Sequence, residues 1–184
     1  LFWPVLIDPP KFIPSKAPRL KGVLQPQESS INNLQSTSTG YGPEDIAFDS
    51  MDRMYTGLSD GRIVRTNTEL TQFEDWINTG GRPLGMEFNT EGNLIVADAI
   101  KGLLSINGLG ETTVLATEFE GDEFNFVDDL AIAKDGVIYF VDASSDYNIT
   151  DDYALKSFLD GRPLGQLLAY HPTSNKIERI RDKL

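Results

Sequence analysis

The stretch Gly81–Ile106 reads GRPLGMEFNTEGNLIVADAIKGLLSI, and its pattern organises the whole chain. Three short apolar runs, at residues 84–88, 94–97 and 102–106, are separated by turns rich in Asn, Gly and Asp. Gly and Asn accept the positive φ that tight hairpins require, so this alternation predicts consecutive strands joined by short turns.

The same pattern occurs twice more, as PEDIAFDSMDRMYTGLSDGRI at residues 43–63 and as VDDLAIAKDGVIYFVD at residues 127–142. Aligning Pro43, Pro83 and Val127 gives repeats that are 40 and 44 residues apart. A repeat of about 40–45 residues with four short strands is typical of a β-propeller blade. We therefore predict an all-β fold, a β-propeller, to which this chain supplies about three blades.

The repeats divide the chain into an arm and a propeller segment. Residues 1–40, rich in Pro, Ser, Asn, Gln and Thr, are expected to form an extended arm that lies over the propeller and lends it an outer strand. Residues 41–184 are expected to form the blades, at about 44–77, 84–116 and 128–180. An insertion at 144–160, with helical turns expected at 153–159, is either a lid or a plain surface loop.

Three blades do not close a ring, because propellers have roughly four to eight of them. An open arc would also leave two unpaired sheet edges. We expect the ring to be completed by the C-terminal half of a longer protein or by a second copy of this chain.

Composition excludes several classes of function. With 28 acidic and 16 basic residues the net charge is −12, which argues against nucleic-acid binding and suits cations. The absence of cysteine excludes disulfides, thiolate nucleophiles and zinc–thiolate sites. His171, the only histidine, falls in a predicted outer hairpin, and no Gly-x-Ser-x-Gly motif is present, so a Ser-His-Asp triad is not predicted.

The sequence has no run of about 18 apolar residues that would predict a membrane-spanning helix. The first seven residues, LFWPVLI, fit either the end of a preceding membrane anchor or an ordinary apolar arm.

Glu44 and Asp128 stand at the same point of their repeats, directly before the innermost strand. Innermost strands line the central tunnel of a propeller, so both carboxylates are expected at its mouth. Converging carboxylates offer the hard oxygen ligands that calcium takes. We predict that Glu44 and Asp128 are catalytic and metal-ligating residues; the alternative is that they cap tunnel-facing backbone amides.

Several motifs, in order, resemble the strictosidine synthase-like family, most closely its adipocyte plasma membrane-associated protein branch. They are GPEDIAF at 42–48, YTGLSDGRI at 55–63, GRPLG at 81–85, ADAIKGL at 97–103, NFVDDL at 125–130 and IYFVDASS at 138–145. The resemblance implies a six-bladed ring with this chain as its N-terminal half. It also implies an anchor ahead of the propeller, hence an extracytoplasmic or membrane-anchored location.

The wider clan includes calcium-dependent lactonases and arylesterases of the paraoxonase and gluconolactonase type. In those relatives the residues matching Glu44 and Asp128 ligate a catalytic calcium, although the family usually has Asn where Asp128 stands. In the paraoxonase branch the residues matching Asp45 and Asp129 ligate a structural calcium. The alternative for Asp45 and Asp129 is hydrogen bonding to backbone N–H groups between blades.

The resemblance therefore favours a calcium-assisted hydrolase of small-molecule esters or lactones. The alternatives are a non-catalytic binding scaffold and a metal-free enzyme of the strictosidine synthase type, whose catalytic glutamate would lie in the absent C-terminal half.

Three further residues are candidates for substrate binding. Arg82 is expected either to orient an anionic group at the tunnel mouth or to form an inter-blade salt bridge. Phe126 and Tyr147 are expected to wall a pocket or to pack in the core. Asp98 and Asp142 close the second strand of their repeats, so we predict that they hydrogen-bond turns.

Overall fold

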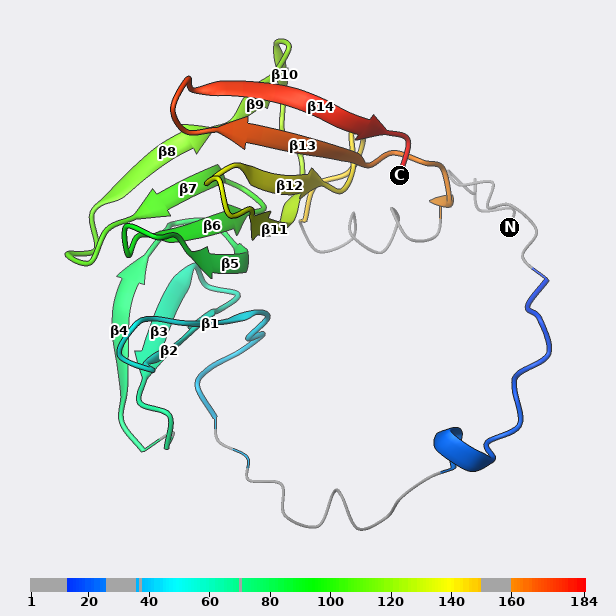
Figure 1. The fold of residues 1–184 in the computed structure, drawn as a ribbon, viewed down its shortest axis with the longest axis horizontal. Helices are drawn as coiled ribbons and strands as arrows, with labels where there is room; N and C mark the ends of the chain where they lie inside the picture. Colours follow the sequence, from blue (N-terminus) through cyan, green and yellow to red (C-terminus); the bar gives the residue numbers. More distant parts are fainter. Residues whose placement is uncertain (1–12, 26–35, 37, 70, 150–159) are drawn as a thin grey trace, which may run out of the picture.

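Three four-stranded antiparallel sheets follow one another along the chain in the computed structural model, which describes residues 13–25, 36, 38–69, 71–149 and 160–184 (Figure 1). The first sheet contains β1 (Ile46–Phe48), β2 (Met54–Gly57), β3 (Arg62–Thr66) and β4 (Phe73–Asn78). The second contains β5 (Pro83–Phe88), β6 (Leu94–Asp98), β7 (Gly102–Ile106) and β8 (Thr112–Ala116). The third contains β11 (Val127–Ile132), β12 (Ile138–Asp142), β13 (Gln166–His171) and β14 (Lys176–Asp182).

Each sheet is a meander whose strands pair in sequence order, and the sheets fan out like the blades of a propeller. Strands β1, β5 and β11 lie at the concave inner side of the arc, whereas β4, β8 and β14 lie at its convex outer side (Figure 1). The inner strand β5 contacts both β1 and β11. The predicted all-β propeller with three blades is thereby confirmed.

Asx turns explain why the strands predicted at 84–88, 94–97 and 102–106 agree with β5, β6 and β7 to within one residue. Asn89 Oδ1 accepts hydrogen bonds from the backbone N–H groups of Glu91 and Asn93, between β5 and β6. Asn107 Oδ1 accepts equivalent bonds from Leu109 and Glu111, between β7 and β8. Such side-chain bonds replace the backbone hydrogen bonds between neighbouring strands for two or three residues. A strand therefore ends at an Asn that can be recognised in the sequence.

Two hydrophobic layers lie between the blades. Between the first and second blades, Tyr55 is packed edge-on against Trp76 and Phe88, with ring centroids 5.1 and 5.0 Å apart. Between the second and third, the fully buried Phe140 is packed edge-on against Phe124 at 5.5 Å. Each internal sheet face is thus covered by the next sheet, which is what a fan of sheets requires.

The described part of the N-terminal arm has little regular structure. Within residues 13–25, 36 and 38–40 the only regular element is the 3₁₀ helix η1 (Gly22–Leu24), and no strand forms there. Ile13, Leu20 and Val23 are exposed. Most of the arm lies outside the described residues, so the expectation that it lends the propeller an outer strand stays a prediction.

A short hairpin between the second and third blades was not predicted. It consists of β9 (Glu118–Phe119) and β10 (Asp122–Glu123). Each of these strands has only two residues, which is too few to produce a periodic hydrophobic pattern in the sequence. The predicted helical turns at 153–159 lie outside the described residues. Among the residues that are described, no helix is long and apolar enough to span a membrane.

Candidate functional site

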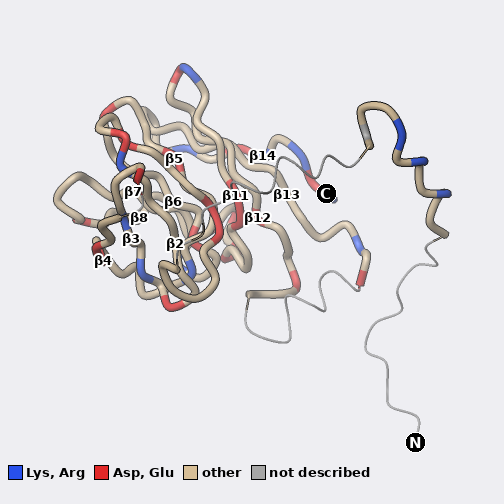
Figure 2. The backbone as a smooth tube through the Cα atoms, turned by 90° about the horizontal axis from the view of Figure 1, so that it is seen from below, with Lys and Arg blue, Asp and Glu red and all other residues tan. Residues whose placement is uncertain are grey.

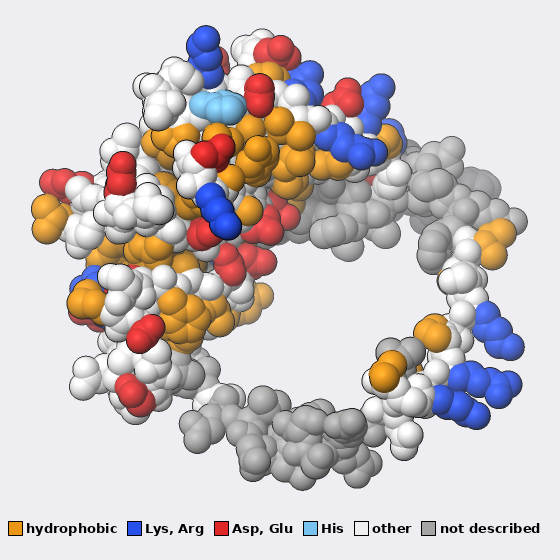
Figure 3. Space-filling view, viewed as in Figure 1, with side chains coloured by type: hydrophobic (Ala, Val, Ile, Leu, Met, Phe, Trp, Pro, Cys, Tyr) orange, Lys and Arg blue, Asp and Glu red, His pale blue; other side chains and the backbone are white. Residues whose placement is uncertain are grey.

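Four carboxylates from two blades line one pocket with a volume of about 200 Å³. Glu44 and Asp45 precede β1, whereas Asp128 and Asp129 belong to β11, and β5 lies between these strands. Acidic side chains gather at the concave inner edge of the arc (Figure 3). The backbone at Asp and Glu positions lies beside β11 (Figure 2). The structure therefore brings Glu44 and Asp128 together as predicted, while their chemical role stays a prediction.

The electrostatics of the pocket are unfavourable to negative charge. Partial burial, followed by the neighbouring Asp128 and Asp45 carboxylates, raises the pKa of Glu44 above its ordinary value. Burial and the adjacent Asp129 likewise raise the pKa of Asp128. Arg82 acts in the opposite direction on Glu44. A cation placed among these groups would relieve the repulsion.

The second blade contributes no carboxylate because Leu84 and Gly85 occupy the corresponding positions. Leu84 is buried in a small apolar cluster. Gly85 lies against the third blade so closely that a Cβ there would be 2.6 Å from Asp129 Oδ1 and 2.8 Å from Asp129 Cα. The missing side chain at Gly85 allows β11, with its two aspartates, to approach β5.

Asp45 forms the backbone bond between blades that was one of its two predicted roles. Its Oδ2 accepts a hydrogen bond from the N–H of Met86 in the second blade at 2.7 Å, and its Oδ1 accepts one from Ile46 at 2.7 Å. Asp129 Oδ1 accepts the corresponding local bond from Leu130 at 2.8 Å.

Glu87 makes a similar link that sequence reasoning missed. Its Oε2 accepts a hydrogen bond from the N–H of Ile132 in the third blade at 2.7 Å. The available signal was a glutamate in the middle of an inner strand, where the other two repeats have Ala47 and Ala131.

Arg82 lies beside Glu44 and joins the first two blades. Its Nη1 donates to the carbonyl oxygen of Gly42 at 2.8 Å. The inter-blade partner is thus a backbone carbonyl rather than the carboxylate of the predicted salt bridge. The positive charge of the Arg82 guanidinium acts to lower the pKa of Glu44. Arg82 therefore remains a candidate for orienting an anionic group at the pocket.

Asp98 has the structural role that its place in the repeat predicted. Its side chain is fully buried, and Oδ1 accepts from the N–H groups of Arg82, Ile100 and Lys101 at 2.8–2.9 Å. Oδ2 accepts from the hydroxyl of Thr79 at 2.7 Å. The residue therefore holds both the turn after β6 and the segment that enters β5.

Asp142 is the equivalent residue of the third blade. Burial raises its pKa, although Oδ1 accepts from the N–H of Phe126 at 2.9 Å and Oδ2 from Nε2 of Gln166 at 3.3 Å. The first blade has the buried Leu58 at this position. The structural role predicted for both aspartates is confirmed.

Phe126 and Tyr147 do not line the carboxylate pocket. Phe126 is buried with Leu84 and Ala99, so it has the packing role that was its alternative. Tyr147 donates its hydroxyl proton to Asp160 Oδ2 at 2.8 Å and so ties together the two described ends of the insertion.

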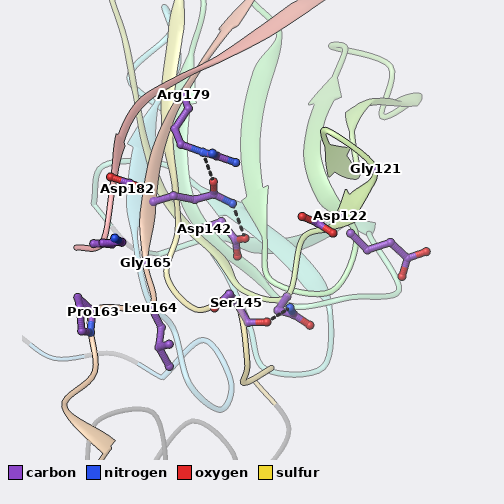
Figure 4. Close-up of a pocket in the computed structure, with 13 residues that line it drawn as sticks. Gly121, Asp122, Asp142, Ser145, Pro163, Leu164, Gly165, Arg179 and Asp182 are labelled. Atoms are coloured by element: carbon purple, nitrogen blue, oxygen red, sulfur yellow. Dashed lines mark hydrogen bonds between the residues drawn. The ribbon is translucent and has the colours of Figure 1, made fainter.

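A larger pocket, of about 690 Å³, lies between the unpredicted hairpin and the ends of β12–β14 (Figure 4). A hydrogen-bonded series crosses it, in which Arg179 Nε donates to Gln166 Oε1 at 3.0 Å and Gln166 bonds Asp142. The pocket includes neither Glu44 nor Asp128, so it is distinct from the carboxylate pocket.

The four carboxylates fit calcium by their chemistry but do not form a complete site. They are hard oxygen donors, and calcium takes about six to eight such oxygens. Among the described residues, however, no group of three or more Asp, Glu, His or Cys side chains is arranged to hold a metal ion. The calcium site therefore stays a prediction.

Comparison with known proteins gives the family resemblance. Residues 31–66 match the family model described as strictosidine synthase-like, N-terminal. Protein STRICTOSIDINE SYNTHASE-LIKE 4 of Arabidopsis thaliana is 44% identical over 138 residues, which cover 72% of this chain and 37% of the plant protein. The chain is similar to strictosidine synthase-like proteins.

A second relative extends the strictosidine synthase-like similarity over most of the chain. The adipocyte plasma membrane-associated protein of Rattus norvegicus is 34% identical over 196 residues, covering 97% of this chain and 51% of the rat protein. The chain thus spans about half or less of the length of these relatives. The narrower assignment to one branch stays a prediction, because identity is higher to the plant protein and coverage higher with the rat protein.

Solved structures share the fold of this chain. A gluconolactonase from Xanthomonas campestris is 16% identical with a TM-score of 0.63, over 78% of this chain and 48% of that protein. Regucalcin from Agrobacterium tumefaciens, titled a calcium-binding protein, is 12% identical with a TM-score of 0.57, over 80% of this chain and 45% of that protein. At these identities the likeness establishes the propeller fold alone.

Asp128→Asn is expected to stabilise the calcium-free protein at neutral pH by about 1 kcal/mol or less, since the site is partly exposed. The folded-state pKa of Asp128 is raised, so its ionised form disfavours the fold. That unfavourable contribution is absent below the unfolded pKa and develops as pH rises through the folded pKa. Urea unfolding in the presence of a chelator should therefore give a higher free energy of unfolding for Asp128→Asn than for the wild type at pH 7. This difference should vanish below about pH 4.

Asp135→Asn, in an exposed turn where Oδ1 accepts from Val137 N–H, is the matched control and should leave the midpoint unchanged. A loss of stability in calcium-free Asp128→Asn at pH 7 would contradict the assigned repulsion.

Proposed function

We propose that this chain supplies part of a calcium-dependent active site that hydrolyses esters or lactones. The observation that carries the proposal is the convergence of Glu44, Asp45, Asp128 and Asp129 on one pocket at the inner edge of two blades. Burial first, and then repulsion from neighbouring carboxylates, raises the pKa of Glu44 and of Asp128, and a divalent cation would favour their ionised forms.

Glu44 and Asp128 are the residues proposed to hold the ion. Asp45 is less available, because Oδ2 is engaged by the Met86 N–H in the neighbouring blade. Calcium, when bound, supplies Lewis acidity toward the carbonyl oxygen of an ester or lactone. The remaining ligands and the substrate-contacting groups are proposed to come from the part of the protein beyond this chain, since its relatives are about twice as long or more.

Within this chain, Arg82 is proposed to act beside the ion. Its guanidinium, fixed by the carbonyl of Gly42, keeps positive charge next to Glu44 and so favours the ionised carboxylate. The same charge would attract a substrate carboxylate toward the pocket. Phe126 and Tyr147 contribute through packing and through anchoring the insertion rather than through substrate contact.

The names of similar proteins support this proposal. One neighbour in fold is named a gluconolactonase and another a calcium-binding protein. The rat relative is named plasma membrane-associated, from which we propose an extracytoplasmic or membrane-anchored location for this protein.

The test is calcium binding together with aryl-ester and lactone hydrolysis by the full-length protein. Glu44→Gln should lower both calcium affinity and turnover by about 100-fold or more, because it removes a direct ligand and loss of an outer-shell partner already costs about 10–100-fold. Glu91→Gln, at an exposed turn, is the control. A protein that binds no calcium at micromolar concentration and hydrolyses neither substrate class would overturn the proposal.

A further inference from the structure

The insertion of the third blade begins with a sequence motif that the proposed function does not use. Residues 148–150 read Asn-Ile-Thr, which is an acceptor sequence for N-linked glycosylation, Asn-x-Ser/Thr with x other than Pro. No other asparagine of the chain is followed by Ser or Thr at the second position. The motif on its own is a weak signal, so its place in the fold decides what it is worth.

The fold places the two described positions of the motif, Asn148 and Ile149, in different surroundings. Asn148 is exposed, whereas the next residue, Ile149, is half-buried and packs against the cluster of Leu84, Ala99 and Phe126. Ile149 therefore fixes the segment to the blades while Asn148 is held at the surface. A bulky hydrophilic group on Asn148 would extend into solvent without displacing the core.

The neighbouring residues hold this stretch in place. Ser144, which is fully buried, accepts hydrogen bonds through Oγ from the N–H groups of Asp146 and Tyr147 at 3.3 and 3.0 Å. Tyr147 in turn bonds Asp160. Asn148 therefore follows a stretch that is bonded to buried Ser144 on one side and, through Tyr147, to Asp160 on the other.

We propose that Asn148 carries an N-linked oligosaccharide. The proposal rests on the extracytoplasmic location proposed above and not on calcium or hydrolysis. Asn148 has neighbours in the structure, and the modified amide keeps its carbonyl oxygen and one N–H for contacts of that kind.

The chemistry is transfer of an oligosaccharide from a lipid diphosphate donor to the side-chain amide nitrogen. The bond from the anomeric carbon to the diphosphate oxygen breaks, and that oxygen retains the electron pair. A bond from the anomeric carbon to Nδ2 forms, and the proton that Nδ2 loses passes to a base of the transferring enzyme or to the released diphosphate. Nothing is oxidised or reduced, and the lipid diphosphate is the leaving group.

The experiment is expression of the full-length protein in a eukaryotic secretory host, followed by digestion with peptide-N-glycosidase and gel electrophoresis. The wild type should lose the mass of one glycan that is attached within residues 1–184, and peptide mapping should place it on Asn148. Asn148→Gln and, separately, Thr150→Ala should abolish that modification. Thr150→Ser should retain it, because serine also completes the acceptor sequence.

A topology control separates failure at Asn148 from failure to enter the secretory pathway. Arg19→Asn combined with Lys21→Thr creates an acceptor sequence in the exposed arm. If this introduced site is modified and Asn148 is not, the proposal is overturned while the location stands. If neither is modified, the proposal and the location fall together, and the calcium and hydrolysis measurements above still decide the proposed function independently.

Discussion

Asp98→Ala is expected to destabilise the full-length protein by about 4 kcal/mol, because each buried donor left without an acceptor costs about 1–3 kcal/mol. The carboxylate is fully buried and accepts three backbone N–H bonds and one hydroxyl bond. Alanine would leave these four donors without an acceptor at the junction of β5 and β6. Urea unfolding at pH 7, followed by tryptophan fluorescence and circular dichroism, measures the loss.

Asp98→Asn provides the matched comparison, since it keeps one carbonyl acceptor and nearly the same shape. Its expected cost is about 1 kcal/mol, the typical value of a single hydrogen bond. Equal losses for the alanine and asparagine variants would show that charge, and not the number of accepted bonds, holds this junction.

Gly85→Ala is expected to cost about 3 kcal/mol, at the upper end of what overpacking in a filled interior costs. The new Cβ would meet Asp129 Oδ1 at 2.6 Å, Asp129 Cα at 2.8 Å and the carbonyl oxygen of Asp128 at 3.1 Å. Two of these atoms belong to the backbone, so the second and third blades must move apart at the inner edge. The unfolding midpoint should fall without loss of the β-sheet spectrum of the native state.

The same substitution tests the geometry of the carboxylate pocket. Because Asp128 and Asp129 would move away from Glu44, calcium affinity should fall in the folded fraction as well. Gly108→Ala is the control, since nothing lies within 4 Å of its added Cβ, and it should change stability by less than about 0.5 kcal/mol. A Gly85→Ala protein with unchanged midpoint would contradict the close approach of the two inner strands.

The candidate site was predictable from sequence where it depends on the repeat and not where it depends on contact between blades. Glu44 and Asp128 occupy one repeat position, and equal positions in successive blades converge on the axis. The bonds from Asp45 to Met86 and from Glu87 to Ile132 join residues 41 and 45 positions apart in different sheets. No local pattern specifies such a pairing, because it depends on how far one sheet is rotated and raised relative to the next.

The sequence by itself determined the all-β repeat, most strand limits, the structural role of Asp98 and Asp142, and the candidates for the acidic pocket. These features follow from residues close together in the chain, where turn chemistry and alternation of side chains act directly. Only the tertiary structure decided that Arg82 bonds a carbonyl, that Phe126 packs in an apolar cluster, that the described arm stays unpaired, and that Gly85 admits β11. Each of these depends on the distance between separate sheets, which the burial of the whole molecule sets.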